Sequence, residues 1–389
     1  MMALLNCLKF KMGSSGRRRS KRVDDHATAD ADDDYCSTTY NDPSTTLKVK
    51  VADDDEVMII KRYSWAEIHR IADNFSSVIG EGGFSTVYLG QYHQYPLAVK
   101  IHRNTSSSQR LSRLFKQELQ IMLQMRHPNI VKLLGYCSDD EREEGALVLE
   151  YVPNGSLHDK LHHDDDDDDE NYSKNYNSSS IGIGVALPWN KRMQIAFQLA
   201  EAIDYLHSSC PLQIVHGDIK SSNVLLDNNL NCRLCDFGSA KMGFSSSVNH
   251  HHHHHDVDRS SLSSSMLPLA GSPGYIDPHY LRTGIASKKN DVYSFGVILL
   301  ELITGMEAFN QKLLTSILTP AILKNDNLMS QMTDPRLAAS GGFPPHHQLL
   351  SMTSLAAHCI LPQPTLRPSM ADIVGIIMTT IDDTTIDRH

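Results

Sequence analysis

Cysteine is scarce in this chain, and long apolar runs are absent. Seven cysteines are scattered through 389 residues, and this odd number gives no disulfide framework and favours a reducing compartment. No run of about 18 apolar residues occurs, so we expect no membrane span. The apolar start of the chain is interrupted by Lys9 and Lys11 and is too short for a signal peptide. These absences predict a cytoplasmic protein.

An excess of positive charge is also lacking. The chain has 36 Lys and Arg against 46 Asp and Glu, a net charge of −10. Seven of the negative charges lie in one acidic run at residues 164–170, so the remainder of the chain is close to neutral. Bulk charge therefore gives no reason to expect a nucleic acid as partner.

The first 62 residues are rich in Arg, Ser, Asp and Thr and predict a disordered tail, 1–62. Arg17–Arg22 carries five positive charges, and Cys7 lies among apolar residues. An acylated Cys7 beside that basic cluster would give the two signals that a peripheral contact with the plasma membrane requires. A nuclear import signal, or a solvated tail with no targeting role, are the alternatives.

Ordered structure is predicted to begin near Tyr63. Ser64 precedes apolar residues at Trp65, Ile68 and Ile71, which have the spacing of one helix face. A serine directly before such a pattern is a typical helix cap. We expect this helix to serve packing alone.

A glycine-rich segment, IGEGGFSTVYLG at residues 79–90, comes next. Its flanks predict two strands joined as a hairpin, whereas a dinucleotide-binding turn runs from a strand into a helix. Gly80 and Gly82 would let the backbone approach phosphate groups closely. A further predicted strand ends in Lys100, and Glu118 follows 18 residues later within a predicted helix at 111–125.

The chemistry is concentrated in HGDIKSSN at residues 216–223 and in the DFG sequence that begins at Asp236. Phosphoryl transfer needs a carboxylate to orient the attacking hydroxyl and oxygen ligands to hold Mg²⁺ against the phosphates. Asp218, Asn223 and Asp236 supply this set, and Lys220 can neutralise charge on the moving phosphoryl group. Two separate motifs in this order and at this distance are a strong indication of such an enzyme.

Taken together, these motifs resemble those of eukaryotic protein kinases. HGDIKSSNVLLD and GYIDPHYL are most similar to plant receptor-like cytoplasmic Ser/Thr kinases. The resemblance covers residues 63–381 and implies an α+β bilobal fold. It divides this region into a small β-rich N-lobe (63–152) and a larger helical C-lobe (153–381), with low-complexity insertions near 162–184 and 243–266 and a tail at 382–389.

The resemblance implies that ATP binds between the lobes. Lys100 would contact the α and β phosphates and pair with Glu118, and Asp218 would accept the substrate hydroxyl proton with Lys220 beside it. Asn223 and Asp236 would hold Mg²⁺. The residues expected to contact ATP are Ile79, Gly80, Glu81, Gly82, Gly83, Phe84, Ser85, Val87, Ala98, Lys100, Glu150, Val152 and Leu225.

The predicted function is transfer of the γ-phosphoryl group of MgATP to Ser or Thr hydroxyls of a protein substrate in receptor-proximal signalling. A membrane receptor kinase is one expected partner. By resemblance, Ser272 should bond near Asp218 and Lys220, and Asp291 should hold the catalytic loop from below.

Two positions depart from the kinase pattern. Gly217 stands where most kinases have an Arg that receives phosphate from the activation loop, so we do not expect that clamp here. His279 stands where a Glu normally pairs with the Arg that Arg367 matches. An unpaired buried Arg would cost about 3–5 kcal/mol, so His279 itself or Asp277 must compensate. The alternative function is a catalytically weak or inactive nucleotide-binding scaffold.

Two low-complexity runs lie in the expected insertions. The acidic run at 164–170 has no fixed geometry for a metal site, and six histidines at 250–255 could bind Zn²⁺ or Ni²⁺ in vitro. We expect both runs to be tolerated repeats.

Overall fold

The computed structural model describes residues 47–51, 54–83, 85–102, 108–139, 144–162, 186–210, 212–243, 271–318 and 331–382. These residues all belong to one compact unit, Ser44–His389. The predictions for Cys7, Arg17–Arg22 and Phe84, for most of the two insertions and for the end of the chain lie outside the described residues.

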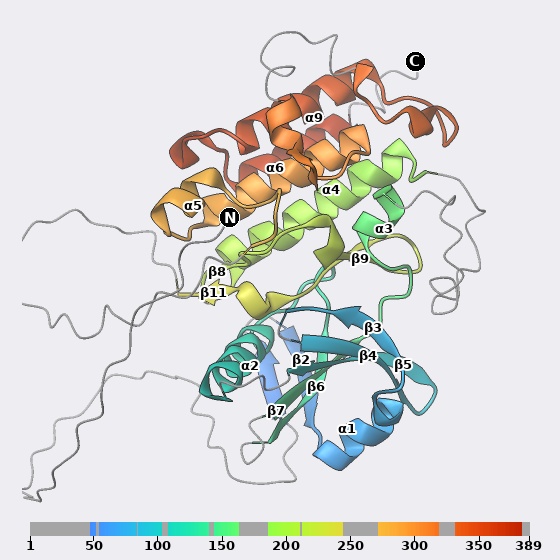
Figure 1. Ribbon diagram of the computed structural model, residues 1–389, viewed down its shortest axis with the longest axis vertical. Helices are drawn as coiled ribbons and strands as arrows, with labels where there is room; N and C mark the ends of the chain where they lie inside the picture. The colour runs from blue at the N-terminus through green and yellow to red at the C-terminus, as the bar shows by residue number, and fades with distance from the viewer. Residues whose placement is uncertain are drawn as a thin grey trace, which may run out of the picture. The chain divides into compact units, whose positions relative to one another are not determined.

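The N-terminal lobe is built on a seven-stranded sheet in the order β1-β2-β6-β7-β5-β4-β3 (Figure 1). The strands are β1 (Leu47–Val51), β2 (Asp54–Arg62), β3 (Val78–Glu81), β4 (Ser85–Tyr92), β5 (Tyr95–His102), β6 (Leu133–Asp139) and β7 (Glu144–Glu150). Neighbouring strands are antiparallel except β2 and β6, which pair in parallel at Lys61 and Gly135.

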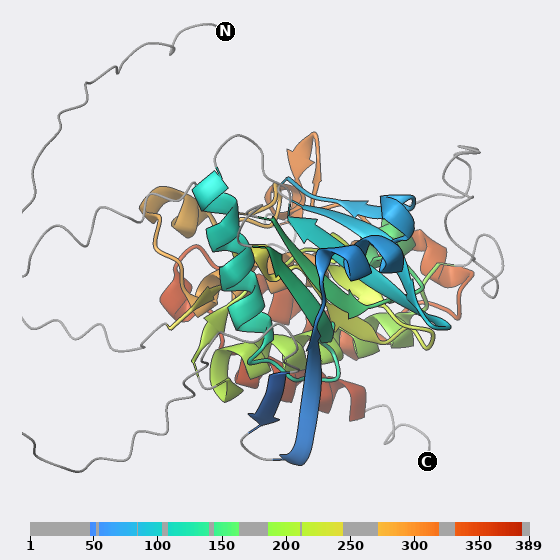
Figure 2. The same ribbon diagram turned by 90° about the horizontal axis from the view of Figure 1, so that it is seen from below.

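Two helices, α1 (Trp65–Ile71) and α2 (Ser108–Met122), cover opposite faces of this sheet (Figures 1 and 2). Successive side chains of a strand point to opposite faces. Along β5, Ala98 joins the apolar cluster that includes Leu119 of α2, whereas Val99 joins the cluster that includes Ile68 of α1. The strand β5 is therefore covered on both faces.

The predicted helix after Ser64 is confirmed as α1. Ser64 accepts a hydrogen bond from the backbone N–H of Glu67, and the Glu67 carboxylate accepts one from the backbone N–H of Ser64 at 2.8 Å. This reciprocal capping box satisfies two donors that the first helical turn cannot pair internally.

The sheet begins earlier in the chain than we predicted. β1 and β2 lie within residues 1–62, which the sequence analysis assigned to a disordered tail, so that boundary is too late for the described residues 47–51 and 54–62. β1 and β2 pair with each other as an antiparallel hairpin, and β2 also pairs in parallel with β6, a strand some seventy residues further on. Local sequence carries no signal for such a distant partner.

The C-terminal lobe is helical. Its described helices are α3 (Leu157–His162), α4 (Trp189–Asp204), α5 (Pro278–Thr283), α6 (Lys288–Thr304), α9 (His346–Cys359) and α10 (Met370–Asp382). Short strand pairs join β8 (Ile214–Val215) to β11 (Lys241–Met242), β9 (Val224–Leu226) to β10 (Cys232–Leu234), and β12 (Phe309–Asn310) to β13 (Lys312–Leu313). The predicted α+β fold with a sheet lobe and a helical lobe is confirmed.

Helix α6 forms the centre of this lobe. Every residue from Asn290 to Thr304 except Ser294 is buried, and a helix that is apolar on all sides must be enclosed by others. It packs against α9 and α4. Among the helices of the described ranges, none is both long and apolar enough to cross a bilayer.

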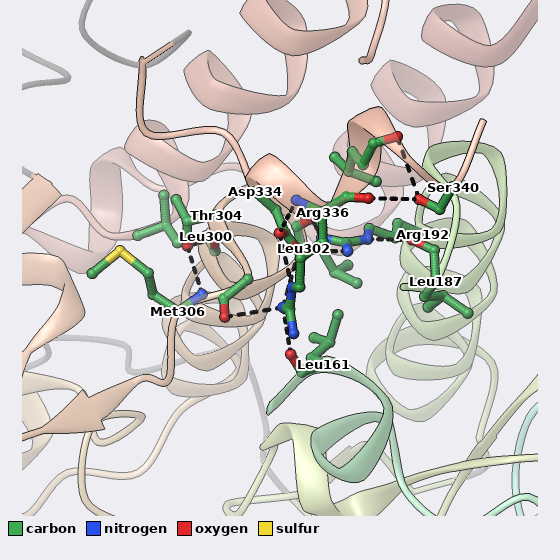
Figure 3. Close-up of polar contacts among 12 residues, drawn as sticks. Leu161, Leu187, Arg192, Leu300, Leu302, Thr304, Met306, Asp334, Arg336 and Ser340 are labelled. Atoms are coloured by element: carbon green, nitrogen blue, oxygen red, sulfur yellow. Dashed lines mark hydrogen bonds and ion pairs between the residues drawn. The ribbon is translucent and has the colours of Figure 1, made fainter. Parts of the chain in front are cut away.

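A cluster of charges, buried except for the partly exposed Arg336, ties three helices together (Figure 3). Arg192 of α4 donates to Asp334 at 2.6 Å and to the carbonyl of Leu302 in α6 at 2.8 Å. Arg336 bonds the other oxygen of Asp334 at 3.0 Å and donates to the carbonyl of Leu161 in α3 at 2.6 Å. Because each charge is paired and hydrogen-bonded, the cluster is tolerated in the interior.

Candidate active site

Lys100, Glu118 and Asp236 meet although they are far apart in the sequence. Nζ of Lys100, in β5, lies 2.7 Å from Glu118 Oε1 in α2 and 2.7 Å from Asp236 Oδ1. The side chains of Lys100 and Glu118 are buried, whereas 43% of the Asp236 side chain is exposed. The Lys100 ammonium group is thus held between the buried carboxylate of Glu118 and the partly exposed carboxylate of Asp236.

Burial and pairing act in opposite directions on these groups. Burial would raise the pKa of Asp236, but the Lys100 ammonium holds that pKa well below its usual range. Burial would lower the pKa of Lys100, yet Glu118 and Asp236 raise it above its usual value. Burial would also raise the pKa of Glu118, and the Lys100 charge lowers it instead. All three side chains are therefore ionised near neutral pH.

His102 is a member of this group that the sequence analysis missed. Its Nε2 lies 2.8 Å from Glu118 Oε2, the carboxylate oxygen that Lys100 does not use. The ring is buried and contacts Phe115 edge-on at 5.5 Å between centroids. A signal was present, because residues i and i+2 of a strand point to the same face, and His102 follows Lys100 by two.

A second constellation surrounds Asp218. The hydroxyl of Ser272 donates to Asp218 Oδ1 at 2.9 Å, and Lys220 Nζ lies 3.0 Å from Asp218 Oδ2 and 2.8 Å from the Ser272 hydroxyl. The side-chain amide of Asn223 donates to the Asp218 backbone carbonyl at 2.8 Å. Both oxygens of Asp218 are therefore oriented, as expected from the resemblance for Ser272.

Asp291 of α6 holds the backbone of this loop. Its Oδ2 accepts from the backbone N–H of His216 at 2.9 Å, and its Oδ1 accepts from that of Gly217 at 2.9 Å. His207 Nε2 lies 2.8 Å from Oδ2. Burial would raise the pKa of Asp291, but the His207 hydrogen bond and these amides lower it, so the support is a buried, ionised carboxylate.

Gly217 adopts a backbone conformation that suits glycine. Its φ is +78°, and a Cβ at this position would lie 3.0 Å from the Ser239 carbonyl. Its N–H still reaches Asp291. The departure from Arg therefore leaves the anchor of the loop unchanged.

The glycine-rich segment forms the predicted hairpin. β3 and β4 pair antiparallel, with Gly80 opposite Val87, and β4 continues into a pairing in which Val87 lies opposite Lys100. The described apolar residues expected at ATP pack against one core cluster, in which Ala98 and Val152 are buried and Ile79, Val87 and Leu225 are partly buried. Of the remaining candidates, Glu81 lies in β3 and Ser85 in β4, Gly82 and Gly83 lie between these strands, and Glu150 ends β7.

Asn223 and Asp236 each keep an oxygen atom that can bind a cation. Asn223 uses its amide nitrogen toward Asp218, and Asp236 uses Oδ1 toward Lys100 and the N–H of Gly238. The amide oxygen of Asn223 and Oδ2 of Asp236 make no intramolecular hydrogen bond among the described residues. Carboxylate and amide oxygens suit a hard divalent cation, so these two residues fit such an ion.

The departure at His279 is compensated by Asp277. Arg367 forms a bidentate pair with Asp277, at 2.7 Å and 2.9 Å, and both side chains are buried. Asp277 also accepts a hydrogen bond from the side-chain amide of Asn290 at 3.1 Å. Of the two candidates named from the sequence, Asp277 provides the partner for Arg367.

Comparison with known proteins agrees with this geometry. Residues 74–376 match the model of the protein kinase domain. Salt tolerance receptor-like cytoplasmic kinase 1 of Oryza sativa subsp. japonica is 46% identical over 319 residues, which cover 81% of this chain and 79% of that protein. A probable receptor-like protein kinase of Arabidopsis thaliana is 39% identical over 393 residues, covering 98% and 96%. PBL7, a probable serine/threonine-protein kinase of the same plant, is 33% identical over 372 residues, covering 93% and 89%. This chain therefore belongs to the protein kinase family, close to the plant receptor-like cytoplasmic kinases.

Proposed function

We propose that this kinase transfers the γ-phosphoryl group of MgATP to Ser or Thr hydroxyls of a protein substrate. The observation that carries the proposal is that Asn223 links the two charged groups. Its side-chain amide donates to the Asp218 carbonyl at 2.8 Å, and its own backbone carbonyl accepts from the N–H of Cys235, the neighbour of Asp236, at 2.9 Å. As in other protein kinases, the reaction uses ATP and a divalent metal ion, and we propose Mg²⁺ as that ion. The Asp218-x-Lys220 spacing supports the Ser/Thr class.

Lys100 is the residue that we propose for the α and β phosphates. In the structure its charge is shared between Glu118 and Asp236. Bound nucleotide would take over the interaction with Lys100, while Glu118 and His102 keep the ammonium in place from the interior. Bound Mg²⁺ would neutralise phosphate charge, with Asn223 and Asp236 as the residues that hold it.

Asp218 is the proposed acceptor of the substrate hydroxyl proton. An ionised carboxylate can both orient the hydroxyl and take its proton as the bond to phosphorus forms. Lys220 lies 3.0 Å from the same carboxylate and would offset the charge on the transferred group. Ser272 fixes the orientation of Asp218 through the hydrogen bond at 2.9 Å.

Two observations count against the scaffold alternative. The charged and amide side chains needed for transfer lie together, and the concern raised by His279 is met by the Asp277–Arg367 pair. Gly217 removes only the Arg that would bind a phosphate of the activation loop. Its backbone N–H still donates to Asp291, so the catalytic loop keeps its anchor. The absence of an Arg at position 217 leads us to propose that activity does not depend on a phosphate clamped at that residue.

A label-transfer experiment tests the function. The full chain is incubated with Mg²⁺, γ-labelled ATP and a basic protein substrate, beside an Asp236→Asn variant. We expect label on Ser and Thr, with a turnover of roughly 1–100 s⁻¹, and a large loss in the variant. Equal label in both proteins, or label on Tyr alone, would contradict the proposal.

Partners beyond the substrate rest on the relatives. The names of the related proteins include receptor-like kinases, and we propose a membrane receptor kinase as an upstream partner. A peripheral membrane contact through Cys7 and Arg17–Arg22 remains a proposal on residues outside the described ranges. Cys7→Ser combined with neutral residues at Arg17–Arg19 should move the protein to the soluble fraction, and a variant that stays on membranes would refute this contact.

A further inference from the structure

A compact group of metal-ligating side chains lies in the C-terminal lobe, apart from the ATP site. His158 and His162 are one helical turn apart in α3, and their ring centroids are 4.8 Å apart. Glu301 reaches them from α6. One potential ligand atom from each of the three residues lies within 4.8 Å of the other two. None of these residues has a role in the phosphoryl transfer described above.

We propose that His158, His162 and Glu301 form a binding site for Zn²⁺. Two imidazoles and one carboxylate are a common protein ligand set for this ion, which takes a tetrahedral arrangement and leaves the fourth position to water. Mg²⁺ and Ca²⁺ prefer oxygen ligands alone. The two sites therefore differ in the ion that they favour: the two histidine nitrogens favour Zn²⁺, whereas the oxygens of Asn223 and Asp236 favour Mg²⁺.

The spacing is close to what the ion requires. Zn²⁺ bonds of about 2.0–2.2 Å place tetrahedral ligand atoms roughly 3.3–3.5 Å apart. His162 Nε2 and Glu301 Oε1 are already 3.0 Å apart. The third ligand atom lies within 4.8 Å of the other two, so it must approach by at most roughly 1.5 Å to reach the same spacing. A turn of the half-buried His158 ring would supply this shift.

The surroundings hold the proposed ligands in place. Tyr275 donates to Glu301 Oε2 at 2.8 Å, which leaves Oε1 toward the histidines. Arg336 donates to the carbonyl of Leu161 at 2.6 Å and so fixes the end of α3 beside His162 (Figure 3). Hydrogen bonds of this kind to ligands and to their backbone orient metal sites.

Two of the three proposed ligands are enclosed by the C-terminal lobe. Glu301 and the His162 side chain are 0% and 4% exposed. Coordination through His162 Nε2 requires the tautomer with its proton on Nδ1, so that Nε2 and Glu301 Oε1 both face the ion instead of sharing a hydrogen bond.

The same atoms also form a hydrogen-bonded network without metal. Ser221 donates to Glu301 Oε1 at 3.2 Å and lies 3.4 Å from His158 Nδ1. The experiment must therefore separate a metal site from hydrogen bonding alone. His162→Gln does so, because the Gln amide can still donate to Glu301 but is a poor ligand for Zn²⁺.

The test measures binding of Zn²⁺ to the full chain. In every protein the histidines at 250–255 are replaced by Ser, because that run would bind the ion by itself. Zn²⁺ affinity is measured by competition with a chromogenic chelator, and bound Co²⁺ is examined for the visible absorption of a tetrahedral site. His158→Gln and His162→Gln are compared with His358→Gln, a control on an exposed histidine of α9.

We expect one saturable Zn²⁺ per chain, a higher Tm with Zn²⁺, and an affinity at least tenfold lower in His158→Gln and His162→Gln but unchanged in the control. Because binding is read directly, a failure here is distinguishable from a failure of the kinase assay. If His162→Gln does not fold, His158→Gln decides alone. Absence of saturable binding, or equal affinity in all variants, would overturn the proposal and leave a hydrogen-bonded network.

Discussion

At the scale of single residues, Arg367 shows how a local change is absorbed by a neighbour. Its expected partner position holds His279, and Asp277, two residues earlier, takes the guanidinium instead. Asp277 also caps α5 by accepting from the backbone N–H of His279 at 2.8 Å. One carboxylate thus joins the start of α5 to the end of the domain.

Asp277→Asn should destabilise the protein by about 3–5 kcal/mol, because it leaves the buried charge of Arg367 without a counter-ion. His279→Gln should change the free energy of unfolding by less than about 0.5 kcal/mol, as is usual away from such features. Urea denaturation of both variants beside the parent checks this. Equal stability of Asp277→Asn and His279→Gln would show that Asp277 is not the anchor.

His102 supports Glu118 in a way that substitution can isolate. His102→Leu removes the donor to Glu118 Oε2 and should reduce kcat/KM for ATP about tenfold, since a hydrogen bond to a charged group contributes about 1.5 kcal/mol or more. His102→Gln retains an N–H donor of similar reach and should stay near the parent. Steady-state kinetics at varied ATP distinguish the two, and identical kinetics for Leu and Gln would argue against this role.

At the scale of elements, two glycines end helices in the same way but in different surroundings. Gly305 follows α6 with φ +66°, and Gly284 follows α5 with φ +68°. A Cβ at Gly305 would lie 2.4 Å from Asp334 Oδ2, whereas a Cβ at Gly284 meets nothing within 4 Å. Asp334 cannot move freely, because Arg192 and Arg336 bind it (Figure 3).

Gly284→Ala should therefore cost only the left-handed backbone strain, about 1–2 kcal/mol. Gly305→Ala adds the displacement of Asp334 from its arginines and should cost roughly 3–5 kcal/mol. The free energies of unfolding of the two variants provide the comparison. Equal losses would mean that the cluster around Asp334 adapts without strain.

The elements also show where sequence reasoning succeeds and where it stops. The hairpin of β3 and β4 and helix α1 were predictable because glycine spacing and the Ser64 cap are local signals. The parallel pairing of β2 with β6 was not, because the two strands lie some seventy residues apart in the sequence. The charged residues of the site were predictable from motif order. The spacing of His102 from Lys100 placed it on the same face of β5, but its partner Glu118 of α2 is known only from the structure.

At the scale of the whole molecule, carboxylates that are paired with cations or bonded to amides make stability depend on pH. The pKa of Asp334 is raised by burial but lowered more by hydrogen bonds from Arg336 and Arg192, and the pKa values of Asp236 and Asp291 are lowered as well. A carboxyl group with a native pKa below its unfolded value stabilises the fold above the unfolded pKa of about 3.9. That stabilisation is lost as pH falls toward the native pKa values.

Urea denaturation between pH 7 and pH 3 should show a free energy of unfolding that falls steeply below about pH 5. Asp334→Asn should make this fall shallower by up to about 1.4 kcal/mol per pH unit, the contribution of one proton. A variant with the slope of the parent, or a parent whose stability rises as pH falls, would contradict the assignment of these ionised groups.

The central claim is that one set of residues performs phosphoryl transfer, and it is tested most directly by kcat of Asp218→Asn. Asp218 makes no bond to Lys100 or Asp236 among the described contacts, so ATP affinity should stay within about threefold of the parent. Loss of the proton acceptor should lower kcat by about 10²–10⁴-fold. An Asp218→Asn variant that binds ATP normally and retains the kcat of the parent would contradict this account.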